Sequence, residues 1–183
     1  MFLANGDKAS IKNALKSLPK IDSKDKSKEL FNLVIKGYQA YGLARSHKHS
    51  GKTKEFTQMS GLLGKLLKQL SDKRMEARKM PYYAQYLILV KSLKSYHAEL
   101  SAEMVGEVGA YNFYQEAIDQ QMDPTRYYPP SILYPMEYKL AKFYEKKGDL
   151  KKARETYKLA LKRMPGHQQS KLAYARLMAL LEE

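Results

Sequence analysis

Apolar residues recur along most of this chain at intervals of three and four, which is the period of amphipathic α-helices. One such run extends from about Glu29 to Ser46, and a second extends from Thr53 to Asp72. The apolar positions of the first run are Leu30, Phe31, Val34, Ile35, Tyr38, Tyr41 and Leu43. Those of the second run are Phe56, Met59, Leu63, Leu66, Leu67 and Leu70. We expect the two helices to pair through these faces as a first hairpin over residues 29–72.

A third apolar run begins near Tyr82 and predicts a second hairpin over residues 82–121. Its buried side is expected to carry Tyr86, Leu89, Val90, Leu93, Tyr96, His97 and Leu100. Gly106 and Gly109 favour a turn between its two helices, because glycine adopts the left-handed backbone that ends many helices. Ser101 offers an alternative, since serine caps helix N-termini and a new helix could begin directly after it.

Polar and proline-rich segments separate these runs. Residues 20–28 hold one apolar side chain in nine, and residues 122–131 hold three prolines. Both compositions predict loops. Residues 1–19 contain a short amphipathic helix, which is either a separate N-terminal packing helix or the second half of a hairpin in a longer array.

The clearest pattern lies in residues 132–165, where Gly148 and Asp149 divide two amphipathic helices. In a 34-residue unit that begins at Tyr134, positions 7, 8, 11, 15, 20, 24, 27 and 32 hold Leu140, Ala141, Tyr144, Gly148, Ala153, Tyr157, Ala160 and Pro165. The small residues allow two helices to approach closely, and the large ones fill the space between neighbouring hairpins. This pattern resembles the tetratricopeptide repeat. Glu137 departs from it, because the family usually has an aromatic residue at position 4.

The resemblance implies an all-α fold in which antiparallel hairpins stack as a right-handed superhelix, an α-solenoid. The second hairpin fits the same register as a degenerate repeat, with small or aromatic residues at positions 8, 20, 24 and 27: Ala98, Ala110, Tyr114 and Ala117. Residues 168–183 restart the register and are expected to form a cap helix. We therefore expect one helical domain over residues 1–183.

The composition is that of a folded protein, with 44% hydrophobic and 28% charged residues in a chain of 183. No apolar run approaches the length of a membrane span, and the opening MFLANGDKAS is too weakly apolar for a secretory signal. The chain has no cysteine, which is compatible with the cytoplasm and with the periplasm. The sequence indicates a soluble protein and leaves its compartment and its oligomeric state open.

Signals for catalysis or cofactor binding are weak. The segment SGKT at 50–53 ends like a phosphate-binding loop, but Ser46 stands where the motif needs glycine and no predicted strand precedes it. The four histidines would have to converge from separate hairpins to hold a metal ion. A row of glutamates on one helical face is expected to be solvated: Glu99, Glu103 and Glu107. We therefore expect no catalytic residue, no metal and no cofactor.

In the tetratricopeptide family, the first helices of successive hairpins line a concave face that commonly holds an extended peptide or a partner helix. Carried over by position, this face would present Tyr138, Lys142 and Glu145 from the third hairpin, and Leu172 and Arg176 from the cap helix. The resemblance thus implies a non-enzymatic scaffold that binds protein. An aromatic ring beside two cations suits an acidic or aromatic-containing peptide.

The charge distribution suggests an alternative function. Residues 1–80 carry 18 basic and 7 acidic side chains, a net charge of +11, whereas the rest of the chain has a net charge of +3. The lysine-rich half predicts weak binding of nucleic acid or of an acidic partner without sequence preference. Of the 33 basic residues 26 are lysine, which a genomic bias toward lysine would also explain. Most of the 15 tyrosines fall on core-facing positions, so packing accounts for them before base stacking does.

Overall fold

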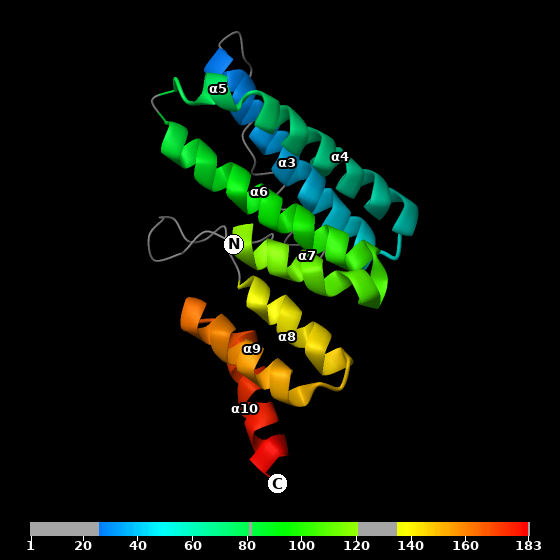
Figure 1. The fold of residues 1–183 in the computed structure, drawn as a ribbon. Helices are drawn as coiled ribbons and strands as arrows, with labels where there is room; N and C mark the ends of the chain where they lie inside the picture. Colours follow the sequence, from blue (N-terminus) through cyan, green and yellow to red (C-terminus); the bar gives the residue numbers. More distant parts are fainter. Residues whose placement is uncertain (1–25, 81, 121–134, 183) are drawn as a thin grey trace.

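The computed structural model describes residues 26–80, 82–120 and 135–182, which form α-helices and short turns with no strand among them (Figure 1). The fold is all-α, as the helical periodicity predicts. The helices are α3 (Lys26–His49), α4 (Thr53–Asp72), α5 (Arg74–Ala77), α6 (Tyr83–Met104), α7 (Gly106–Gln120), α8 (Met136–Lys146), α9 (Leu150–Arg163) and α10 (Gln168–Glu182). The predicted helix in residues 1–19 and the predicted loop at residues 122–131 lie outside the described residues.

Helices α3 and α4 form the first hairpin and pack through the predicted apolar faces. Leu43 is the exception, since it is exposed. Helix α3 begins at Lys26, so residues 26–28 belong to a helix and not to the predicted linker. Lysine and glutamate are good helix formers, and a polar composition without glycine or proline does not end a helix. The same helix runs on to His49, close to Gly51, whose φ of 69° makes the turn.

Helices α6 and α7 form the second hairpin. Gly106 has a φ of 70°, which confirms the glycine turn and excludes a helix start after Ser101. The turn is tighter than predicted, because α6 reaches Met104 and Gly109 already lies inside α7. Ala98, Ala110 and Ala117 are among the buried residues between the two helices and their neighbours.

Helices α8 and α9 form the third hairpin. Gly148 has a φ of 77° in the turn, and the Asp149 side chain accepts a 3.1 Å hydrogen bond from the backbone N–H of Lys152. This cap satisfies an N–H group that the first turn of α9 would otherwise leave unpaired. The three alanines assigned to close helix contacts are completely buried: Ala141, Ala153 and Ala160.

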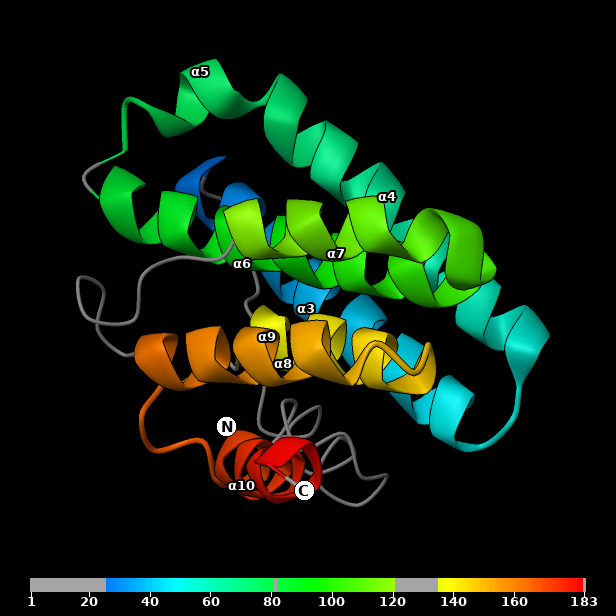
Figure 2. The same cartoon turned by 60° about the horizontal axis from the view of Figure 1, so that its bottom comes forward.

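The hairpins are stacked in chain order, from α3 and α4 at one end to α10 at the other (Figure 1). Helix α6 packs against both α3 and α4, α7 packs against α8, and α9 packs against α10. In Figure 2 α10 is seen nearly end-on while α8 and α9 lie across the view, so the last helix crosses the third hairpin obliquely.

Three glycines show how the helix contacts were only partly predictable. Glycine weakens a helix by up to about 1 kcal/mol relative to alanine, so Gly61 and Gly64 in α4 were expected where another helix passes close by. At Gly64 an added Cβ would lie 2.9 Å from Nε2 of His97, which confirms the expectation. At Gly61 no atom would lie within 4 Å, so the expectation is wrong there. The tightest contact is at Gly37 in α3, where a Cβ would lie 2.7 Å from Cδ1 of Leu93.

We predict that Gly37→Ala and Gly61→Ala change stability in opposite directions. Gly37→Ala overpacks the core against the completely buried Leu93 and should destabilise the fold by about 1 to 3 kcal/mol. Gly61→Ala adds a methyl group in open space and should stabilise α4 by up to about 1 kcal/mol. Urea unfolding followed by circular dichroism would measure the free energy of unfolding of both variants. If both variants were stabilised, or both destabilised, the α3–α6 contact would be contradicted.

Ala153→Leu tests the packing inside the third hairpin. Ala153 is fully buried between α8 and α9, so the larger side chain should destabilise the fold by about 1 to 3 kcal/mol. Ala179→Leu is the matched control, because Ala179 is exposed on α10. The urea midpoint of Ala153→Leu should fall and that of the control should stay within error; equal midpoints would show that the register of the repeat is wrong.

Candidate functional site

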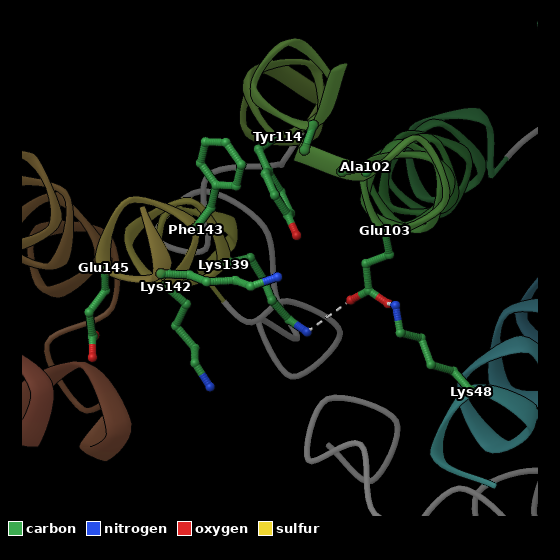
Figure 3. A pocket seen from close by; sticks show the side chains of 11 residues that line it. Lys48, Ala102, Glu103, Tyr114, Lys139, Lys142, Phe143 and Glu145 are labelled. Carbon is green, nitrogen blue, oxygen red and sulfur yellow. Dashed lines mark hydrogen bonds and ion pairs between the residues drawn. The ribbon is translucent and has the colours of Figure 1, made fainter. Parts of the chain in front are cut away.

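A groove of about 560 Å³ opens between α3, α6, α7 and α8. Figure 3 shows Tyr114 and Phe143 on one wall, with Glu103 and Lys48 on the other. Lysines surround it from two helices: Lys48 from α3, and Lys139, Lys142 and Lys146 from α8. A cavity of this size is within the range that holds a small ligand or a few residues of a peptide.

Glu99 of α6, one turn before the groove residue Glu103, has a side chain with no exposed surface. The phenol of Tyr41 donates a 2.9 Å hydrogen bond to its Oε2 atom. On the other oxygen, Oε1, Nζ of Lys139 lies at 3.1 Å and a guanidinium nitrogen of Arg45 at 3.4 Å. An isolated carboxylate would not stay charged in such a place, so these groups together keep the buried charge tolerable.

Glu103 lies one turn further along α6 and binds the same cations nearer the surface. Its Oε1 atom lies 2.8 Å from the Arg45 guanidinium and 3.4 Å from Nζ of Lys139. Nζ of Lys48 lies 2.7 Å from the other oxygen. Two carboxylates and three cations thus connect α3, α6 and α8, and the cluster carries one surplus positive charge.

The electrostatics of Glu103 follow from this cluster. Burial by itself would raise the pKa of Glu103, but Arg45, Lys139 and Lys48 outweigh it and lower that pKa to about 2. Burial also raises the pKa of the Tyr41 phenol well above its ordinary value, and the neighbouring Glu99 carboxylate adds to this. Tyr41 therefore stays a hydrogen-bond donor, and its ring stacks on Tyr96 with the centroids 4.3 Å apart.

The sequence-based expectation for these glutamates is wrong. Glu99 and Glu103 were expected on a solvated face, but Glu99 is buried and the Glu103 side chain is only 10% exposed, both at helix contacts. The side chain of Glu107 lies outside the described residues. The signal was present in the spacing: Glu99 and Glu103 follow the core residue Tyr96 by three and seven positions, which places them beside the same apolar stripe.

The residues assigned by position to a peptide-binding face gather around the third hairpin. Nζ of Lys142 lies 5.8 Å from the ring centroid of Tyr138. Glu145 accepts a 2.9 Å hydrogen bond from the phenol of Tyr157 and forms an ion pair with Arg176 of α10. The Tyr157 ring also lies against that of Tyr138, with the centroids 5.8 Å apart, so four of the five predicted residues form one connected set.

Two features of this set differ from what position alone suggests. Arg176 forms an ion pair with Glu145, so it does not face the groove as an unpaired cation. Leu172 is 72% exposed on α10 and makes no contribution to the groove. Only Lys142 and Glu145 of the predicted five line the groove, whose other walls come from α3, α6 and α7.

Glu137, which departs from the tetratricopeptide pattern, has an ion-pair partner in the structure. It is buried at the start of α8, and its Oε1 atom lies 2.5 Å from Nε of Arg163 at the end of α9. The pair joins the two ends of the third hairpin where the family has an aromatic contact. A second hollow of about 520 Å³ lies beside it, between α7, α8 and α9.

The remaining signals considered from the sequence are a phosphate-binding loop, a metal site and a membrane span. Residues 50–52 form the turn from α3 to α4 and Thr53 begins α4, with no strand beside them in the described part of the chain. Within the described ranges, no group of three or more His, Asp or Glu side chains could hold a metal ion. None of the described helices is long and apolar enough to cross a membrane.

Comparison with known proteins adds no relative, since no family model, no curated protein and no solved structure matches the chain. The resemblance to the tetratricopeptide repeat therefore stays a prediction from the sequence pattern.

We predict that acid weakens the fold through Glu103. Its pKa is about 2 in the folded chain against 4.5 for the free side chain, so its contribution is complete above about pH 4.5 and is lost as the pH falls toward 2. That contribution is on the order of 3 kcal/mol. The urea midpoint of Glu103→Gln should therefore decline less between pH 5 and pH 2.5 than that of the unaltered protein.

Glu155→Gln provides the control for this pH experiment. Glu155 is an exposed carboxylate on α9 whose ion pair, among the described residues, is with the adjacent Arg154. Surface pairs contribute little, so this variant should keep the full acid-induced decline. Parallel declines in Glu103→Gln and the unaltered protein would contradict the assigned role of Glu103.

Proposed function

We propose that this protein is a non-enzymatic helical scaffold that binds an acidic segment of a partner protein in the groove between α3, α6, α7 and α8. The observation that carries the proposal is the origin of the groove walls. The first helix of each of the three hairpins contributes to its lining, and α7 adds part of the apolar wall. First helices are the ones that the resemblance to the tetratricopeptide repeat assigns to peptide binding.

The charge of the groove supports an anionic ligand. Four lysines line it against two carboxylates, those of Glu103 and Glu145. Both carboxylates are already bound, Glu103 by the buried cations and Glu145 by Arg176. Lys142 is exposed and has no ion pair with any described residue, so it is available to a ligand.

The walls of the groove also favour a peptide over a bare ion. Tyr114 and Phe143 pack at a centroid distance of 6.0 Å and form its apolar side. Aromatic side chains supply contact area at a small entropic cost, and cations beside them steer an acidic partner. The right-handed superhelix implied by the repeat pattern would extend this face along the array.

The ion pairing of the acidic groups favours a scaffold over an enzyme. Glu103 lines the groove and Glu99 lies one turn before it on α6, and each is paired with cations from other helices. A general acid or base needs a group that can exchange a proton near neutral pH. The low pKa of Glu103 does not meet that need.

We predict that Lys142→Glu weakens binding of an acidic peptide. The probe is a fluorescein-labelled peptide of mixed Asp, Glu and Tyr residues, measured by anisotropy against a lysine-rich peptide of the same length. Charge reversal at the groove rim should lower the affinity on the order of tenfold. The thermal midpoint should hardly change, because Lys142 is exposed.

Lys158→Glu is the matched control, since it makes the same change in net charge at an exposed position of α9 away from the groove. This variant should bind the acidic peptide as the unaltered protein does. If the two variants bind equally, the attraction belongs to the net charge of the protein and the groove assignment is wrong.

A further inference from the structure

Helix α10 is docked on the end of the helix stack through a small apolar contact. It packs mainly on α9, and no described helix lies beyond it (Figure 1). Of its described side chains, Leu177 is the fully buried apolar one, with Ala173 and Tyr174 partly buried beside it. Elements with few buried apolar contacts open more readily than the core. The hydrogen bonds at the ends of α10 therefore have a large effect on whether this helix stays docked.

His167 caps the first turn of α10. Its Nδ1 atom accepts a 3.2 Å hydrogen bond from the backbone N–H of Ser170, and the Ser170 hydroxyl oxygen lies 2.8 Å from the same nitrogen. The His167 carbonyl accepts a 3.1 Å hydrogen bond from the backbone N–H of Lys171. Ser170 is completely buried, so its N–H group has no access to water. His167 thus makes the hydrogen bond that serine, threonine, asparagine or aspartate makes at most capped helices.

This cap requires an uncharged imidazole. A backbone N–H can only donate, so Nδ1 must be the unprotonated nitrogen and the proton of the neutral ring sits on Nε2. A proton on Nδ1 would turn that nitrogen into a donor, which the Ser170 hydroxyl could accept but the Ser170 N–H could not. Protonation would therefore leave a buried N–H group unpaired and place a positive charge at the N-terminal end of a helix. Both effects are unfavourable.

The surroundings of the His167 ring do not offset that charge. The Tyr138 ring of α8 lies against it in a T-shaped arrangement, with the centroids 5.0 Å apart. The charged side chains of the neighbouring elements are engaged elsewhere or exposed: Lys142, Glu145 and Arg176 around Tyr138, the Glu137–Arg163 pair between α8 and α9, and Lys171 on α10. Among the described residues no carboxylate forms an ion pair with His167, and burial lowers the pKa of its ring below the ordinary 6.5.

We propose that His167 is a pH-sensitive cap that keeps α10 docked on the third hairpin near neutral pH and releases it in mild acid. Because the folded chain holds the imidazole uncharged, the contribution of the cap is complete above about pH 6.5 and is lost as the pH falls below that value. The contribution of Glu103 is complete down to about pH 4.5, so the two acid responses occupy different pH ranges.

Release of α10 would also change the peptide groove, and this consequence rests on the proposed function. Arg176 of α10 forms an ion pair with Glu145, which lines the groove. Without α10 the Glu145 carboxylate would lose this cation and would repel an acidic ligand. Mild acid should therefore weaken binding of the acidic peptide.

Hydrogen–deuterium exchange of the full chain at pH 7.5 and pH 5.5, followed by mass spectrometry, tests the cap. Each exchange rate is divided by the rate of an unstructured peptide at the same pH, which gives a protection factor. The protection factor of α10 peptides should fall roughly fivefold at pH 5.5, as expected for loss of one typical helix cap.

His167→Asn is the matched variant, because asparagine also caps a helix and carries no charge at either pH. Its α10 protection should be the same at both pH values. His167→Ala lacks the cap and should show the low protection at both. His97→Gln controls for titration elsewhere, since burial also lowers the pKa of His97. This variant should keep the full response of α10.

A measurement on the unaltered protein is independent of these variants. The ¹⁵N chemical shifts of the imidazole should show an unprotonated Nδ1 in His167 at pH 7.5. A protonated Nδ1 at that pH would overturn the proposal. So would an equal loss of α10 protection in His167→Asn and the unaltered protein, or unchanged α10 protection in the unaltered protein at pH 5.5.

The labelled acidic peptide separates this proposal from that of the groove. Its affinity at pH 5.5 relative to pH 7.5 should be lower for the unaltered protein than for His167→Asn. If the peptide fails to bind at both pH values, the groove assignment is wrong, and the exchange measurement still decides the cap. Loss of α10 protection with the same affinity ratio in both proteins would overturn the coupling between the cap and the groove.

Discussion

The charge of Glu99 has no access to water, so the fold must bring partners to it from other helices. Tyr41 and Arg45 reach it from α3, and Lys139 reaches it from α8. Removing one partner from a buried pair typically destabilises a protein by about 3 to 5 kcal/mol, because the remaining charge stays buried. An apolar core tolerates small sliding of one helix past another, whereas this cluster is satisfied in one arrangement only. We infer that it fixes how the first helices of the three hairpins sit beside one another.

The same cluster gives the groove its character. Arg45, Lys48 and Lys139 exceed the two carboxylates by one charge, and two of these cations, Lys48 and Lys139, line the groove with two further lysines. Each of these cations already contacts a carboxylate. Lys142, at the rim, is exposed and has no ion pair with a described residue. The paired cations therefore build the site, whereas the exposed lysine would select its ligand.

The helical elements could be predicted from the sequence because each rests on local periodicity and on glycine. Gly106 and Gly148 adopt the left-handed backbone where turns were expected. The contacts between hairpins were harder to predict, since they depend on pairs far apart in the chain. Gly37 meets Leu93, and Arg45 meets Glu99, across more than fifty residues. The glutamates could have been recognised by their spacing from Tyr96, but a single sequence does not show which cation would neutralise them.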